Sequence, residues 1–250
     1  MLEGMRMTQR PVLVAVAHGS RDPRALPAVR ALVERVRTAR PGLEVRLGHV
    51  ELDEPLLGDT LAGLRGTAVL VPLLLGRGHH VKHDLPAALA AAPWVTGAVA
   101  APLGPDPLLA ETLHDRLRAA GWTRAGRAVV LAAAGSRDPQ SAADTARTAA
   151  LLAARLGVPV APAYASAAAP TVPEAVAGLV SRGIARDRIA VASYFTAPGR
   201  FATQTAAAAP WIAAAPLGAH PAMARLVLQR YDEAAAALPR TGSHRLAHAG

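Results

Sequence analysis

The sequence contains one stretch twice, and this internal repeat constrains the fold more than any other feature of the chain. Residues 12–23 read Val-Leu-Val-Ala-Val-Ala-His-Gly-Ser-Arg-Asp-Pro, and residues 128–139 read Ala-Val-Val-Leu-Ala-Ala-Ala-Gly-Ser-Arg-Asp-Pro. The second copy follows the first by 116 positions, since Ala134 stands where the first copy has His18. Repetition at a fixed distance indicates a duplicated structural unit. We therefore expect two similar halves.

Each copy of the repeat predicts a strand, a tight turn and the start of a helix. Residues 12–17 form a continuous apolar run with several β-branched side chains, which is typical of a parallel strand buried on both faces. Gly19 allows a sharp turn, and Asp22 and Pro23 suit the N-cap and the first position of a helix. His18 is therefore expected at the carboxyl end of a strand, where open α/β sheets bind ligands.

The remaining sequence alternates strand-like and helix-like segments, which predicts an α/β fold with two doubly wound parallel sheets facing a cleft. The predicted domains are residues 11–121 and 127–238, joined by a linker at 121–127, and both have the usual size of a domain. Strands are expected at 12–17, 43–50, 68–75, 95–101, 128–134, 158–164 and 188–195. Helices are expected at 22–39, 55–64, 85–92, 106–120, 141–156, 172–182 and 221–237, with a loop at 196–201.

Composition limits the chemistry and the partners. The chain has no cysteine, which excludes disulfides, thiolate metal sites and cysteine nucleophiles. Its net charge of +9 suits an acidic ligand, but the arginines are scattered and only 3% of residues are aromatic, so base-stacking nucleic-acid modules are disfavoured. Apolar runs such as 68–75 are far shorter than the roughly 20 residues that span a bilayer. We expect a cytoplasmic protein without nucleic-acid or membrane partners, with residues 1–10 as an extension outside the fold.

Three polar side chains follow successive strands in the first half. They are His18, Glu51 and His80. Because parallel strands end at one edge of a sheet, we expect these side chains to lie close together. Two imidazoles and one carboxylate suit a borderline divalent ion such as iron, cobalt, nickel or zinc, and they leave coordination positions open for exchange.

Alternatives remain for two of the three positions. His79 differs from His80 by one residue of register, and Asp53 or Glu54 could be the acid if Glu51 only caps the following helix. The remaining histidines are expected to be structural or superficial, with His83 at the surface near a helix start and the tail histidines too sparse to store metal. These are His49, His83, His114, His220, His244 and His248.

The second half provides an internal control for this set. Ala134, Ser166 and Phe201 occupy the positions that correspond to His18, Glu51 and His80, although Gly-Ser-Arg-Asp-Pro is kept. A group required only for folding should be kept together with the fold motif. The loss of all three polar groups therefore favours a functional role for the first set.

Three motifs in this order resemble the sirohydrochlorin chelatases, the class II chelatases that insert cobalt or iron into a tetrapyrrole. The motifs are residues 17–23, Val50-Glu51-Leu52 with Pro55, and residues 72–86, Pro-Leu-Leu-Leu-Gly-Arg-Gly-His-His-Val-Lys-His-Asp-Leu-Pro. The resemblance covers nearly the whole chain, as a two-domain form of the family. It implies that His18 and His80 handle the metal and that Glu51 assists them. The second half departs from the pattern, which implies one active site per chain and a C-terminal half that acts as scaffold and substrate wall.

The resemblance implies an enzyme with no permanently bound cofactor, whose divalent metal (Co²⁺, Fe²⁺ or Ni²⁺) is a substrate. A neutral histidine, with its ordinary pKa of about 6.5, can accept the protons that leave the pyrrole nitrogens. The carboxylates of sirohydrochlorin would meet basic side chains on both sides of the cleft. The candidates are Arg21, Arg77, Lys82, Arg137 and Arg200.

Several questions stay open at this level. Arg21 and Arg137 have a second interpretation as structural partners of the helix-capping aspartates. The same ligands serve cobalt and iron, so neither the sirohaem nor the cobalamin pathway is favoured. A non-catalytic carrier of a tetrapyrrole or metal, and a basic nucleic-acid-binding protein, are alternative functions. We expect a monomer with pseudo-twofold halves.

Overall fold

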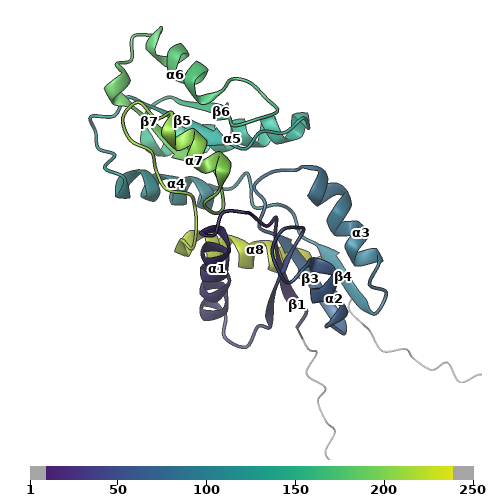
Figure 1. Cartoon of the computed structure of the whole chain (residues 1–250). Coiled ribbons are helices and arrows are strands. Elements are labelled where there is room, and N and C mark those ends of the chain that lie inside the picture. The colour runs from purple at the N-terminus through teal and green to yellow at the C-terminus, as the bar shows by residue number, and fades with distance from the viewer. Residues whose placement is uncertain (1–9, 239–250) are drawn as a thin grey trace, which may run out of the picture.

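The computed structural model describes residues 10–238, which form two parallel α/β sheets with helices on both faces of each (Figure 1). The predicted extension at the N-terminus falls almost entirely outside the described residues, as do His244 and His248. None of the helices within residues 10–238 is long and apolar enough to cross a membrane. The predicted fold class is confirmed.

All strand pairs within the two sheets are parallel. The first sheet has the order β2-β1-β3-β4, and the second has the order β6-β5-β7. The strands are β1 (Val12–Ala17), β2 (Val45–His49), β3 (Gly66–Pro72), β4 (Val95–Val99), β5 (Ala128–Ala133), β6 (Val160–Tyr164) and β7 (Ile189–Ser193). All six residues of β1 and all six of β5 are buried, as their apolar runs predict for central strands covered on both faces.

The helices agree with the predicted segments at most positions. They are α1 (Ala25–Ala39), α2 (Leu57–Ala62), α3 (Leu85–Ala90), α4 (Pro107–Ala119), α5 (Pro139–Leu156), α6 (Val172–Val180), α7 (Arg200–Ala207) and α8 (Pro221–Ala237), with a π-helix η1 (His80–Asp84) and a 3₁₀ turn η2 (Arg186–Arg188). Helix α7 was not predicted, because its Thr- and Ala-rich sequence has no wide apolar stripe.

The two copies of the repeat start their helices differently. Asp138 and Pro139 occupy the predicted N-cap and first position of α5, and the Asp138 carboxylate accepts the N–H of Gln140. In the first copy the prediction is wrong, since α1 starts only at Ala25 and its cap residue makes no side-chain hydrogen bond. Asp22 instead accepts hydrogen bonds from the backbone and guanidinium of Arg24, which lower the pKa of Asp22 to about 2.

The last helices of the two halves are exchanged. Helix α4 packs on α5 and β7 of the second half, whereas α8 packs on α1, β3 and β4 of the first half, and α4 and α8 also contact each other. Figure 1 shows α4 beside the second sheet and α8 next to α1, between the first sheet and the second half. The predicted domain ranges 11–121 and 127–238 stay a prediction, and the packing shows that each half is closed by a helix from the other.

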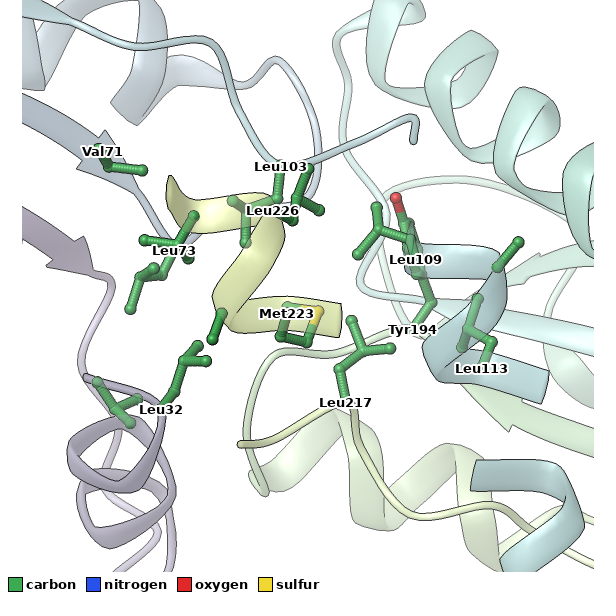
Figure 2. Close-up of a cluster of buried hydrophobic side chains, with 14 of the residues drawn as sticks. Leu32, Val71, Leu73, Leu103, Leu109, Leu113, Tyr194, Leu217, Met223 and Leu226 are labelled. Carbon is green, nitrogen blue, oxygen red and sulfur yellow. The ribbon is translucent and has the colours of Figure 1, made fainter. Parts of the chain in front are cut away.

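A single hydrophobic core joins the halves through these exchanged helices. Figure 2 shows Met223 and Leu226 of α8 between Leu73 on the first-half side and Leu109 of α4 on the other. Separate outer clusters lie under α2 and α3 in the first half and under α6 in the second. Alternate residues of β1 and β5 point into the shared core and into the outer clusters, as a strand dictates.

Two arginines reinforce the exchange reciprocally. Arg116 on α4 donates to the carbonyl of Leu217 in the second half at 2.8 Å, and Arg230 on α8 donates to the carbonyl of Leu103 in the first half at 3.2 Å. Arg230 also bonds the carboxylate of Asp106 at 3.0 Å. Each exchanged helix is therefore fixed by polar contacts to the segment that leads into the other.

Candidate functional site

His18 lies directly after β1, at the carboxyl edge of the first sheet. Its carbonyl accepts the N–H of Glu51 at 3.0 Å, so the backbone joins the ends of β1 and β2. Gly19 follows with φ +98°, and a Cβ there would stand 1.7 Å from the carbonyl oxygen of Glu51. Only glycine fits this approach, which brings positions 18 and 51 next to each other.

Glu51 faces His18, with 3.6 Å between Glu51 Oε1 and His18 Nδ1. The two alternative acids accept backbone N–H groups, Asp53 from the loop after β1 and Glu54 from its own loop. The Asp53 carboxylate accepts the N–H of Ser20 at 2.9 Å, and the Glu54 carboxylate accepts the N–H of Leu56 at 3.2 Å. The geometry thus favours Glu51 as the acid beside the histidine.

His80 stands across from His18, with the ring centroids 4.7 Å apart and the planes nearly perpendicular. His79 is more exposed, with 74% of its side chain accessible and its ring 6.4 Å from that of His80. The geometry therefore favours His80 over His79 as the partner of His18.

Asp84 is a site residue that the sequence interpretation missed. His80 Nδ1 lies 2.6 Å from Asp84 Oδ2, a distance at which the ring donates its Nδ1–H to the carboxylate. A carboxylate on Nδ1 orients the ring and leaves Nε2 as the nitrogen available to a metal, as carboxylates do for metal-binding histidines. The four-residue spacing of His80 and Asp84 at a helix start was the available signal.

The segment that carries His80 is a π-helix, η1, and it continues into α3. Short π-helical segments are rare and are found frequently at functional sites. The corresponding segment of the second half is the ordinary α-helix α7. Within residues 10–238, no three His, Asp or Glu side chains are placed so that they could hold one metal ion. The predicted three-ligand metal site of His18, Glu51 and His80 is therefore not formed in this structure, where His18 contacts Glu51 and His80 pairwise.

The predicted substrate-binding side chains fall into two groups. Arg77 and Lys82 cross to the second half: Arg77 Nε donates to the almost fully buried Asp144 at 2.9 Å, and Lys82 pairs with Asp138. These hydrogen bonds raise the pKa of Arg77 and lower the pKa of Asp138. The two contacts hold the His80 segment against the second half.

Arg21, Arg137 and Arg200 form the exposed group. Arg200 lies over the ring of Phe201, 5.5 Å from its centroid. Arg21 and Arg137 are not paired with Asp22 and Asp138, because those carboxylates are paired with Arg24 and Lys82. The structural interpretation of these two arginines is therefore wrong.

A pocket of about 470 Å³ opens between the halves beside this edge. The first half lines it with His79, Lys82 and His83, and the second half lines it with residues that include Arg137 and Asp138. The predicted cleft between the halves is thus present. His83 is exposed as expected, and it faces this cleft.

The CbiX family model matches the chain twice, over residues 12–120 and 128–234. The chain belongs to the CbiX family. The two matches place one CbiX unit in each half, in agreement with the duplicated sheets and with the family resemblance of the motifs.

Relatives of this CbiX chain carry chelatase names. A sirohydrochlorin cobaltochelatase of Methanosarcina barkeri is 30% identical over 129 residues, which are 46% of this chain and 99% of the relative. A sirohydrochlorin ferrochelatase of Bacillus subtilis is 28% identical over 151 residues, covering 57% of this chain and 58% of the relative. The structure of SirB from Bacillus subtilis with Fe³⁺ superposes with a TM-score of 0.74 at 25% identity and covers 91% of this chain and 96% of that chain.

Proposed function

We propose that this chain is a sirohydrochlorin chelatase that inserts a divalent metal ion, cobalt or iron, into the tetrapyrrole. The observation that carries the proposal is the placement of His18, Glu51 and His80 at one sheet edge, with 4.7 Å between the two imidazoles. Membership of the CbiX family and the chelatase names of the relatives support the same activity.

Insertion replaces two pyrrole N–H protons by one divalent cation, so two protons leave and the charge of the macrocycle is unchanged. Nε2 of His80 acts as metal ligand or proton acceptor, because Asp84 holds its other nitrogen. His18 is the second metal ligand or proton acceptor. The carboxylate of Glu51 beside it stabilises the imidazolium that proton uptake produces. Water then carries both protons away.

The substrate carboxylates bind the basic side chains of the cleft. Arg137 is best placed, since it lines the pocket, and Arg21 and Arg200 extend the basic rim. Arg77 uses two of its five side-chain donors on Asp144, which leaves donors of a 43% exposed side chain for substrate. Lys82 contacts substrate by exchanging the Asp138 carboxylate for one of the tetrapyrrole.

The metal is a substrate in this proposal, and the protein needs no resident cofactor. One chain, acting as a monomer, contains one such site, because the second half lacks the histidines and the acid. Nickel fits the same ligand set as cobalt and iron. The relative rates with the three metals decide between the sirohaem and cobalamin pathways.

Visible absorption during anaerobic incubation of sirohydrochlorin with Co²⁺, Fe²⁺ or Ni²⁺ tests the activity. We expect many turnovers per chain for the wild type, loss of turnover in His18→Ala and Glu51→Ala, and wild-type rates in Ser166→Ala, the matched change in the second half. A rate equal to the uncatalysed reaction contradicts the proposal. An absorption change that stops at one equivalent identifies a carrier instead.

A further inference from the structure

A second pair of histidines lies beside the candidate site. The rings of His79 and His83 have centroids 4.7 Å apart with planes tilted by 38°, and both residues are exposed and line the pocket between the halves. The proposed insertion step uses neither of them. Imidazole is the commonest metal ligand in proteins, so two imidazoles in contact at the surface of a cleft can bind a divalent ion.

The spacing of this outer pair, His79 and His83, suits a shared metal ion. With metal–nitrogen distances of about 2.1 Å, two imidazoles on one ion have ring centroids roughly 4.5–5 Å apart for bond angles near 90–109°. The outer pair has the same 4.7 Å separation as His18 and His80. Histidines four residues apart on one helical turn hold metal in this way in other proteins.

Asp84 connects the two pairs. Its Oδ1 lies 3.6 Å from His79 Nε2, and its Oδ2 lies 2.6 Å from His80 Nδ1. The rings of His79 and His80 are 6.4 Å apart, so four imidazoles follow one another from the pocket to the site, in the order His83, His79, His80 and His18.

The charges around the outer pair permit a cation. Lys82, which lies between the two histidines in sequence, is neutralised by Asp138 of the second half. Arg137 also lines the pocket, and the Asp84 carboxylate, with Oδ1 3.6 Å from His79 Nε2, supplies negative charge beside the outer pair. In the second half, Arg200 and Gln204 stand at the positions of His79 and His83, so the pair is present in the first half alone among the described residues.

We propose that His79 and His83 form an outer metal-binding station that takes up the divalent ion from solution and passes it along Asp84 to His80 and His18. Water completes the coordination shell of the ion at the station. The transfer step rests on the proposed chelatase function, whereas binding at the station does not.

Titration of the full chain with Co²⁺ in the absence of tetrapyrrole tests the station directly, by calorimetry and by the visible bands of bound cobalt. We expect His79→Ala and His83→Ala each to bind one equivalent less than the wild type, and His18→Ala to retain the station. His114→Ala is the matched control, because His114 also contacts a carboxylate, Asp115, at 2.9 Å. Equal stoichiometry in the wild type and His83→Ala overturns the station.

Kinetics separate the station from the activity. In His83→Ala we expect the KM for cobalt to rise about tenfold or more, the usual effect of weakening a metal site, with kcat unchanged at saturating metal. Turnover with an unaltered KM in this variant refutes the transfer while the chelatase function stands. If His83→Ala binds one cobalt equivalent less than the wild type and the wild type shows no turnover, the chelatase function is refuted while the station stands.

Discussion

The two halves have the same backbone at the sheet edge but different side chains. Gly19 and Gly135 both have positive φ, and a Cβ on either would stand 1.7 or 1.8 Å from the carbonyl of Glu51 or Ser166. Leu52 and Ala167 follow with φ of 68° and 56°. Because the strained turn persists where no reactive side chain is present, the strain belongs to the scaffold, and the chemistry belongs to the side chains.

The His80 segment differs in both side chains and helix type. His80 and Asp84 of the π-helix correspond to Phe201 and Thr205 of α7, where the Thr205 hydroxyl only bonds backbone carbonyls of its own helix. The candidate ligand, the carboxylate that bonds it and the π-helix are therefore all absent from the second half. This comparison supports the proposal that Asp84 acts together with His80.

The largest effect is expected when the first site is made like the second. His80→Phe should lower kcat/KM for metal insertion by about 10²–10⁴-fold, because a positioned proton acceptor and metal ligand is removed. Phe201→His, the reverse change in the second half, should leave the rate unaltered. Initial rates from visible absorption measure both. A His80→Phe enzyme with the wild-type rate would show that the catalytic groups do not lie at the sheet edge that carries His80.

The shared turn should respond equally in both halves. Gly19→Ala and Gly135→Ala should each destabilise the protein by about 2–4 kcal/mol, since alanine meets both a positive φ and a carbonyl oxygen. Urea unfolding followed by circular dichroism gives the two free energies of unfolding. A large cost at Gly19 with none at Gly135 would contradict a purely structural role for the turn.

The two ion pairs that join the His80 segment to the second half should differ in strength. Arg77→Ala leaves the carboxylate of Asp144, which is 1% exposed, without its cation, and should cost about 3 kcal/mol. Lys82→Ala breaks the more exposed pair with Asp138 and should cost less than about 1 kcal/mol. Thermal unfolding of both variants provides the measurement, and equal losses would refute the distinction.

The last effect concerns the caps of the exchanged helices. Asp106 caps α4, and His220 caps α8 by accepting the N–H of Ala222 at its Nδ1. Burial lowers the pKa of His220, so the unfolded chain binds the proton more readily than the folded one. The stability that the neutral ring provides is present above about pH 6.5 and is lost as the pH falls through the lower folded pKa.

We therefore expect the unfolding free energy of the wild type to fall between pH 7 and pH 5 through this group. His220→Asn keeps an uncharged cap and should flatten that part of the profile. Urea unfolding at several pH values compares the two proteins. Identical profiles would exclude His220 as the cause.

Local sequence patterns were sufficient for the central strands and the turns that follow them, although they missed helix α7, the start of α1 and the role of Asp84 beside His80. The repeat predicts both central strands and both turns, and the polar residues after the strands predict the grouping of His18, Glu51 and His80. The family resemblance then agreed with the CbiX matches.

Features that depend on partners distant in sequence could not be predicted. The leucine faces of α4 and α8 predict burial but not which sheet covers them, so the exchange of these helices was missed. Arg77 and Lys82 could be assigned to the cleft but not to Asp144 and Asp138, since no local pattern connects them. The pairing of His79 with His83 depends on the helical path of η1 and likewise needed coordinates.

The exchanged helices make this chain resemble a domain-swapped dimer whose two subunits have been joined by a peptide. Each half alone would leave the sheet face that receives the other's helix uncovered, so an isolated half would aggregate or seek a second copy. A chain nicked within residues 123–127 would remain interlocked through α4, α8 and their two arginines. The peptide link between the halves therefore matters less for holding the molecule together than for pairing. It ensures that a half with His18, Glu51 and His80 always packs against a half that lacks them.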